Sequence, residues 1–85
     1  MPRPRTIQGK EALVWLEILL AYAFSKKYHR EALLSLLDIA RDSVFYDEIL
    51  DWQLAYNLLH WAEKYVSPDD WQRLQARVRK RRNQA

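Results

Sequence analysis

The chain contains no cysteine, and this absence removes two kinds of chemistry. Neither a disulfide framework nor a thiolate metal site can form, while a reducing compartment is permitted without being required. Glycine occurs once and proline three times in 85 residues, so little in the chain breaks a helix. Because 49% of the residues are apolar and 13% are aromatic, we expect packed helices and not a disordered chain.

The chain also has no apolar run long enough to span a membrane. Every residue from Ala12 to Phe24 except Glu17 is apolar, but Ser25 ends the run, and a bilayer-spanning helix needs about 20 such residues. The run begins only at Ala12 and no small-residue cleavage site follows it, which argues against a signal peptide. We therefore expect a cytoplasmic protein that does not bind a membrane.

No catalytic or cofactor motif stands out. There is no serine–histidine or glycine-loop arrangement, and neither His29 nor His60 has a nucleophile or a paired carboxylate at an informative spacing. Asp47, Glu48 and Asp51 could be imagined as a cation site, but no histidine lies at a matching spacing. The helix dipole explains acids at a helix start better. We therefore expect no enzyme activity, no cofactor and no metal site.

Four helices are predicted from the apolar spacing and from capping residues. The first is apolar nearly all round, which places it at the centre of the fold or under another molecule. Asp47 can cap the third helix, and Ser67, followed by a proline, can cap the fourth, which is expected to fray beyond Val78. The expected ranges are about 10–27, 30–41, 47–65 and 67–78.

These elements predict an all-α fold, a small bundle of about four helices arranged as two antiparallel helical hairpins. Residues 1–8, where two prolines flank Arg3, are expected to form a mobile basic arm. Residues 9–82 then form a single helical domain, and residues 83–85 a disordered tail. A weak internal repeat agrees with two hairpins, and chance is the alternative explanation. At an offset of 37, the repeat matches Glu11, Leu13, Trp15, Lys27 and Tyr28 with Glu48, Leu50, Trp52, Lys64 and Tyr65.

The net charge of +3 hides a strong segregation of charge along the chain. Residues 1–30 carry six bases and two acids, residues 31–70 carry two bases and nine acids, and residues 71–85 carry six bases and no acid. The two basic ends can therefore fold against the acidic middle, meet the middle of another copy, or bind a polyanion.

The basic C-terminus has three explanations. Bases at a helix end interact favourably with the helix dipole and need no ligand. Six bases after Trp71, five of them arginine, exceed what capping requires and suit bidentate phosphate contacts. The third explanation is docking on an acidic protein. The residues expected to contact nucleic-acid phosphates or an acidic partner are Arg3, Arg5, Lys26, Lys27, Arg30, Arg73, Arg77, Arg79, Lys80, Arg81 and Arg82.

Four tryptophans are many for a chain of this length. Trp15, Trp61 and Trp71 are expected in the core, since tryptophan on a helix usually packs. Trp52 and Tyr56 lie off the main apolar face of their helix. They can therefore be buried in the core or form a protein-contact surface, and the sequence leaves both alternatives. The residues expected at a protein interface are Phe45, Tyr46, Trp52 and Tyr56, and a homodimer would use the same residues.

The leading hypothesis is a non-enzymatic accessory subunit of a nucleoprotein assembly. It would dock on protein through aromatic surface and contact nucleic-acid phosphates with its basic C-terminal helix. The protein would contact the sugar–phosphate backbone and would not read base sequence. The reason is that the sequence has no zinc-ligand spacing, no RNP-like aromatic strand and no clear recognition helix. The alternative is a protein-only adaptor or inhibitor, of the small mobile-element type, whose basic end binds an acidic groove of its target.

Overall fold

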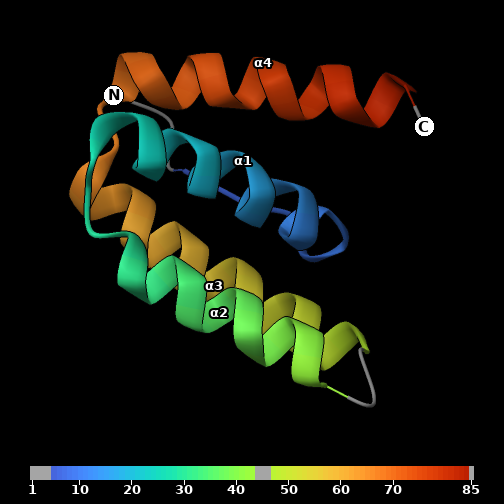
Figure 1. Cartoon of the computed structure of the whole chain (residues 1–85). Coiled ribbons are helices and arrows are strands. Elements are labelled where there is room, and N and C mark those ends of the chain that lie inside the picture. The colour runs from blue at the N-terminus through green and yellow to red at the C-terminus, as the bar shows by residue number, and fades with distance from the viewer. Residues whose placement is uncertain (1–4, 44–46, 85) are drawn as a thin grey trace.

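The structure of the chain is a computed structural model, which describes residues 5–43 and 47–84. Over these residues it contains a 3₁₀ turn, η1 (Gly9–Glu11), and the four helices α1 (Ala12–Lys26), α2 (Arg30–Asp42), α3 (Glu48–Tyr65) and α4 (Pro68–Gln84) (Figure 1). No strand occurs among them, so the predicted all-α bundle of four helices is confirmed. None of the helices in the described ranges has the length and apolar character needed to cross a bilayer.

Local sequence explains where the helices begin and end. The Oδ1 atom of Asp47 accepts a hydrogen bond from the N–H of Leu50 at 3.0 Å, and the Ser67 hydroxyl oxygen accepts one from the N–H of Asp70 at 3.2 Å. Both residues are therefore the N-caps that the sequence predicts. Lys27 ends α1 in the left-handed region, with a φ of 57° and its N–H bonded back to the last turn.

Helix α1 lies at the centre of the bundle and packs against α2, α3 and α4 (Figure 1). This position agrees with its apolar circumference. Leu16 and Leu19 of α1 are completely buried, as are Leu33 of α2 and Leu58 of α3. Burying a leucine side chain stabilises a fold by about 1.5–3 kcal/mol, so these residues anchor α2 and α3 to α1.

Helix α4 runs antiparallel to α1 and packs along it, whereas chain order suggests a hairpin with α3 (Figure 1). Trp71, Leu74 and Val78 form the buried seam of α4. Trp71 stacks on Trp15 of α1 with ring centroids 4.4 Å apart. Together with Trp61, which is 5% exposed, these tryptophans lie in the core, as predicted.

Helix α4 is longer than predicted. It continues to Gln84, so the expected fraying beyond Val78 is wrong, and residues 83 and 84 are helical where a disordered tail was expected. Arg81 pairs with Glu17 of α1 and Arg82 with Glu11 of η1, and both pairs hold this last turn against the bundle. These contacts join residues far apart in the chain, and local sequence cannot reveal them.

Residues 5–8 pack against the bundle, where a mobile arm was expected. Ile7 is buried, and Nη1 of Arg5 donates a hydrogen bond to the carbonyl oxygen of Ala62 at 2.5 Å. The Arg5 guanidinium also lies 5.7 Å from the ring centroid of Trp71, within range of a cation–π interaction. Arg5 therefore fastens the N-terminal segment to α3 and α4. Arg3 lies outside the described residues.

Candidate binding surfaces

The predicted basic residues fall into two groups at opposite ends of α4, because α1 and α4 are antiparallel (Figure 1). Lys26, Lys27 and Arg30 lie at the turn between α1 and α2, near the start of α4. The bases of residues 77–82 lie near the start of α1. Arg73 lies on α4 between the two groups and pairs with Asp70, on which the charge of Lys26 also acts.

The turn group is held by local contacts. The Arg30 guanidinium lies 5.0 Å from the ring centroid of Phe24, and Lys27 is the C-cap of α1. The positive charge of Lys26 acts on the carboxylate of Asp70 at the start of α4. Lys26 and Arg30 thus have local contacts that need no ligand, whereas the capping role of Lys27 belongs to its backbone N–H and its side chain is exposed.

A polar contact between α1 and α4 lies beside this turn. The Tyr22 hydroxyl donates a hydrogen bond to Oδ2 of Asp70 at 2.8 Å. Burial, together with this bond and the charge of Asp70, raises the pKa of Tyr22 to about 12. The same bond is the main cause that lowers the pKa of Asp70, with help from Lys26, Ser67 and Arg73. The contact therefore favours a protonated tyrosine and an ionised aspartate.

Arg81 and Arg82 pair with the two acids of α1 and its N-terminal turn. Nη2 of Arg81 lies 2.6 Å from Oε2 of Glu17 at the surface. Nη1 of Arg82 lies 3.4 Å from Oε2 of Glu11, whose side chain is only 14% exposed. That oxygen has no hydrogen-bond partner among the described residues, so Arg82 supplies the charge that balances it. These two arginines therefore have a structural role.

The remaining bases of α4 are available to a ligand. Arg77, Arg79 and Lys80 are exposed and form no ion pair with any residue that the structure describes. The side chain of Arg73 is 81% exposed and makes only a 3.8 Å pair with Asp70. Arg73, Arg77 and Lys80, at i, i+4 and i+7, form one exposed row that we call the basic stripe. Beside it, a groove of ≈ 320 Å³ is lined by Ile18, Arg77, Lys80, Arg81 and Gln84.

The basic stripe lies on the opposite side of the molecule from the acidic residues of α2 and of the first turn of α3. Helix α1 separates α4 from α2 and α3 (Figure 1). Helix α2 carries exposed Glu31, Asp38 and Asp42, and the first turn of α3 carries Glu48 and Asp51. Within the described ranges, none of these five acids forms an ion pair. The segregation of charge along the chain thus becomes a segregation in space.

The structure shows that Trp52 and Tyr56 are exposed, by 59% and 64% respectively. Ile49, which is not among the predicted interface residues, is 67% exposed and lies one turn before Trp52. Their i, i+3, i+7 spacing, visible in the sequence, places all three on one face of α3. We call these three residues the aromatic stripe. Phe45 and Tyr46 lie outside the described residues.

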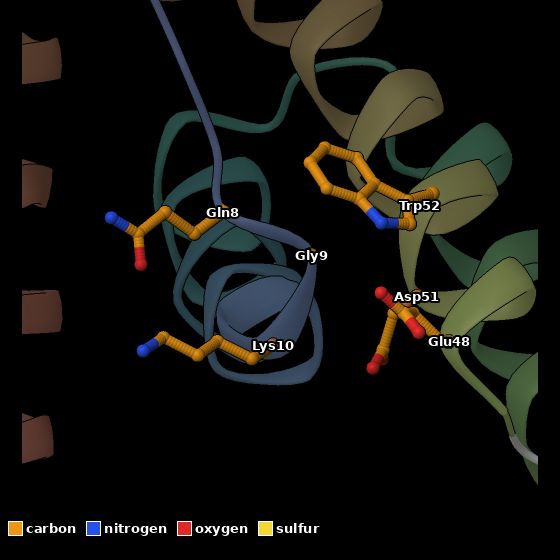
Figure 2. A pocket seen from close by; sticks show the side chains of 6 residues that line it. All are labelled: Gln8, Gly9, Lys10, Glu48, Asp51 and Trp52. Carbon is orange, nitrogen blue, oxygen red and sulfur yellow. The ribbon is translucent and has the colours of Figure 1, made fainter.

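The indole ring of Trp52 lies against the single glycine of the chain (Figure 2). A Cβ atom added to Gly9 would lie 3.5 Å from two ring atoms, which is ordinary contact distance. The carboxylates of Glu48 and Asp51 lie beside the ring, and these residues line a hollow of ≈ 450 Å³ together with Gln8, Gly9 and Lys10. Trp15, the repeat counterpart of Trp52, is only 3% exposed, so the two repeat units pack differently.

Comparison with protein-family models, with curated proteins and with solved structures finds no match for this chain. Among the residues that the structure describes, no group of three or more histidine, aspartate or glutamate side chains is placed to hold a metal ion. The basic stripe and the aromatic stripe are therefore the two surfaces whose chemistry suggests a ligand.

Proposed function

We propose that the protein is a non-enzymatic accessory subunit of a nucleoprotein assembly and that it contacts nucleic-acid phosphates through α4. The observation that carries this proposal is the exposure of Arg77, Arg79 and Lys80 without an acidic partner in the described structure. A base with no partner in its own molecule is available to neutralise a phosphate, and arginine does so with two parallel hydrogen bonds.

Helix capping does not account for these bases. The helix-dipole effect falls off within the last turn, which holds Arg81 and Arg82. Arg73 and Arg77 lie further back, where a positive charge gains little from the dipole. Their exposure in one row with Lys80 matches a surface that follows a phosphate backbone.

The acidic side of the molecule limits how a nucleic acid can bind. Glu31, Asp38 and Asp42 on α2 would repel a strand that wraps around the bundle. We therefore propose contact along one edge, with backbone phosphates and without reading base sequence. A single edge of three or four bases gives weak binding alone, which suits a subunit that also docks on protein through the aromatic stripe. We place this function in the cytoplasm, a reducing compartment that suits a chain without cysteine.

Fluorescence anisotropy with nuclease-treated protein tests this proposal. Labelled single-stranded and double-stranded DNA and RNA are titrated across a salt series, and affinity is expected to fall linearly in log salt. Neutralising Arg77, Arg79 and Lys80 to alanine should weaken binding to every sequence alike. The control neutralises Arg41 and Lys64, two exposed bases outside the predicted phosphate-contacting set, and should bind like the parent protein.

A protein-only adaptor or inhibitor is the second candidate, and the aromatic stripe favours it. Exposed tryptophan and tyrosine are typical anchors of protein interfaces. In this case the basic stripe occupies an acidic groove of the target. Absence of nucleic-acid binding at low salt would contradict the first proposal and leave this one.

A further inference from the structure

The basic stripe and the acids beside the aromatic stripe are opposite in charge, but they cannot touch each other within one molecule. The basic stripe carries Arg77 and Lys80, which form no described ion pair, and Glu48 and Asp51 lie beside the aromatic stripe, also without one. Helix α1 lies between α4 and α3 and keeps the two surfaces apart (Figure 1). Only another molecule can bring such surfaces together.

We propose that the α3 face, formed by the aromatic stripe with Glu48 and Asp51, binds the basic stripe of a second copy of this chain, head to tail. This inference rests on the opposite charge of the two surfaces: the basic stripe can pair with the carboxylates of the α3 face. The proposal does not depend on nucleic-acid binding.

The chemistry of the α3 face suits an arginine or lysine side chain. The exposed part of the Trp52 ring can accept a cation over its face, while the alkyl stem of the base covers neighbouring apolar surface. Glu48 and Asp51 lie beside that ring, so the same cation is within reach of a carboxylate (Figure 2). The protein already uses guanidinium-on-ring contacts internally, with Arg5 on Trp71 and Arg30 on Phe24.

Charge also excludes the symmetric arrangements. A two-fold contact through α3 would bring both copies of Glu48 and Asp51 into one interface without a basic partner, and a two-fold contact through α4 would oppose the two basic stripes. Like charges that face each other across an interface are costly. A head-to-tail contact avoids both, and it leaves one stripe open at each end, so that further copies can add.

The contact is expected to be weak. Helix α4 offers an edge of about 25 Å by 10 Å, so the two partners together bury on the order of 500 Å². Stable interfaces bury about 1,200 Å² or more. We therefore expect association only at protein concentrations above roughly 100 μM and at low salt, where charge pairs are least screened.

Sedimentation analysis of the nuclease-treated full chain tests the proposal, over about 10 to 1,000 μM protein. At about 50 mM salt, the weight-average mass should rise with concentration beyond that of a dimer; at about 500 mM it should return to the monomer mass. A monomer at every concentration in low salt would overturn the proposal.

Charge exchange makes the test specific. Arg77→Glu with Lys80→Glu puts acids on α4 as well as on the α3 face, and Glu48→Lys with Asp51→Lys puts bases on the α3 face as well as on α4, so each double variant alone should stay monomeric. When the two variants are mixed in equal amounts they should associate, because the acidic surfaces of one can pair with the basic surfaces of the other. Arg41→Glu with Lys64→Glu changes the charge equally at exposed positions elsewhere and should associate like the parent chain. A folded mixture that stays monomeric would overturn the proposal.

A second variant keeps the test valid if lysines at the start of α3 impair folding. Trp52→Ala with Tyr56→Ala removes two exposed rings while all charges remain. This variant should stay folded by circular dichroism and lose association at about 50 mM salt. Association equal to that of the parent chain would show that the aromatic stripe is not the docking surface.

Discussion

Glu11 shows how one side chain can set the role of another at the far end of the chain. Its carboxylate is largely buried, and the charge that balances it comes from Arg82 on α4. Sequence alone assigns Arg82 to a ligand-binding tail, because nothing local marks it as a partner of Glu11. The same holds for Arg5, which the structure places on Ala62 and Trp71.

Removing Arg82 should therefore destabilise the fold. In Arg82→Ala the carboxylate of Glu11 loses its balancing charge, and we expect a loss of about 1–3 kcal/mol in the free energy of unfolding. Urea unfolding at neutral pH measures this loss. Adding Glu11→Gln should restore part of it, and Arg79→Ala, at an exposed position without a pair, should cost less than about 0.5 kcal/mol. Equal stability of the two arginine variants would contradict this role.

Tyr22 should make stability depend on alkaline pH. Its pKa is raised to about 12 in the folded protein, above its ordinary value of 10.0. The stabilising contribution of Tyr22 is therefore complete below pH 10 and is lost as the pH rises through about 12. Denaturant unfolding of the parent chain and of Tyr22→Phe should show a stability difference that shrinks over this range. A difference that is constant with pH would contradict the Tyr22–Asp70 contact.

At the scale of the elements, local sequence predicts where helices begin more reliably than which helices pair. Asp47 and Ser67 are recognisable caps because their chemistry involves only the next three residues. The position of α4 depends instead on Trp15, Glu17 and Glu11, which lie more than fifty residues away from their partners on α4. The exposure of Trp52 also depends on tertiary packing, since α3 has more apolar surface than the core covers.

The seam between α4 and α1 should carry much of the stability of the bundle. Leu74→Ala empties a buried position and should lower the free energy of unfolding by about 2–4 kcal/mol. Tyr56→Ala, on the exposed face of α3, should lower it by less than about 1 kcal/mol. Chemical denaturation of the two variants and of the parent chain measures these free energies of unfolding. A larger loss in Tyr56→Ala would contradict the packing of α4 on α1.

At the scale of the whole molecule, charge is divided between two sides of a small bundle. The order of charged residues in the sequence reveals the segregation of charge along the chain. Only the fold shows that the bases of α4 are kept away from the acids of α2 and α3. The predicted basic site is correspondingly reduced: Arg5, Arg81 and Arg82 have structural roles, while Arg73, Arg77, Arg79 and Lys80 keep exposed charge.

If α4 binds both phosphates and a second copy, the two ligands should compete. A short duplex DNA added to associated protein at about 50 mM salt should reduce self-association, because both use Arg77 and Lys80. Sedimentation with labelled protein measures this change, and a neutral polymer of similar size serves as the control. Self-association that persists with the basic stripe saturated by DNA would show that different surfaces are used.

The salt dependence of nucleic-acid binding tests the central claim most directly. For duplex DNA, each phosphate neutralised contributes about 0.9 to the slope of log affinity against log salt. Neutralising Arg77, Arg79 and Lys80 should therefore lower that slope by up to about 2.7, while the Arg41 and Lys64 control leaves it unchanged. If the first variant keeps the parent slope and affinity, or if the parent protein binds no nucleic acid at low salt, α4 is not a phosphate-binding surface.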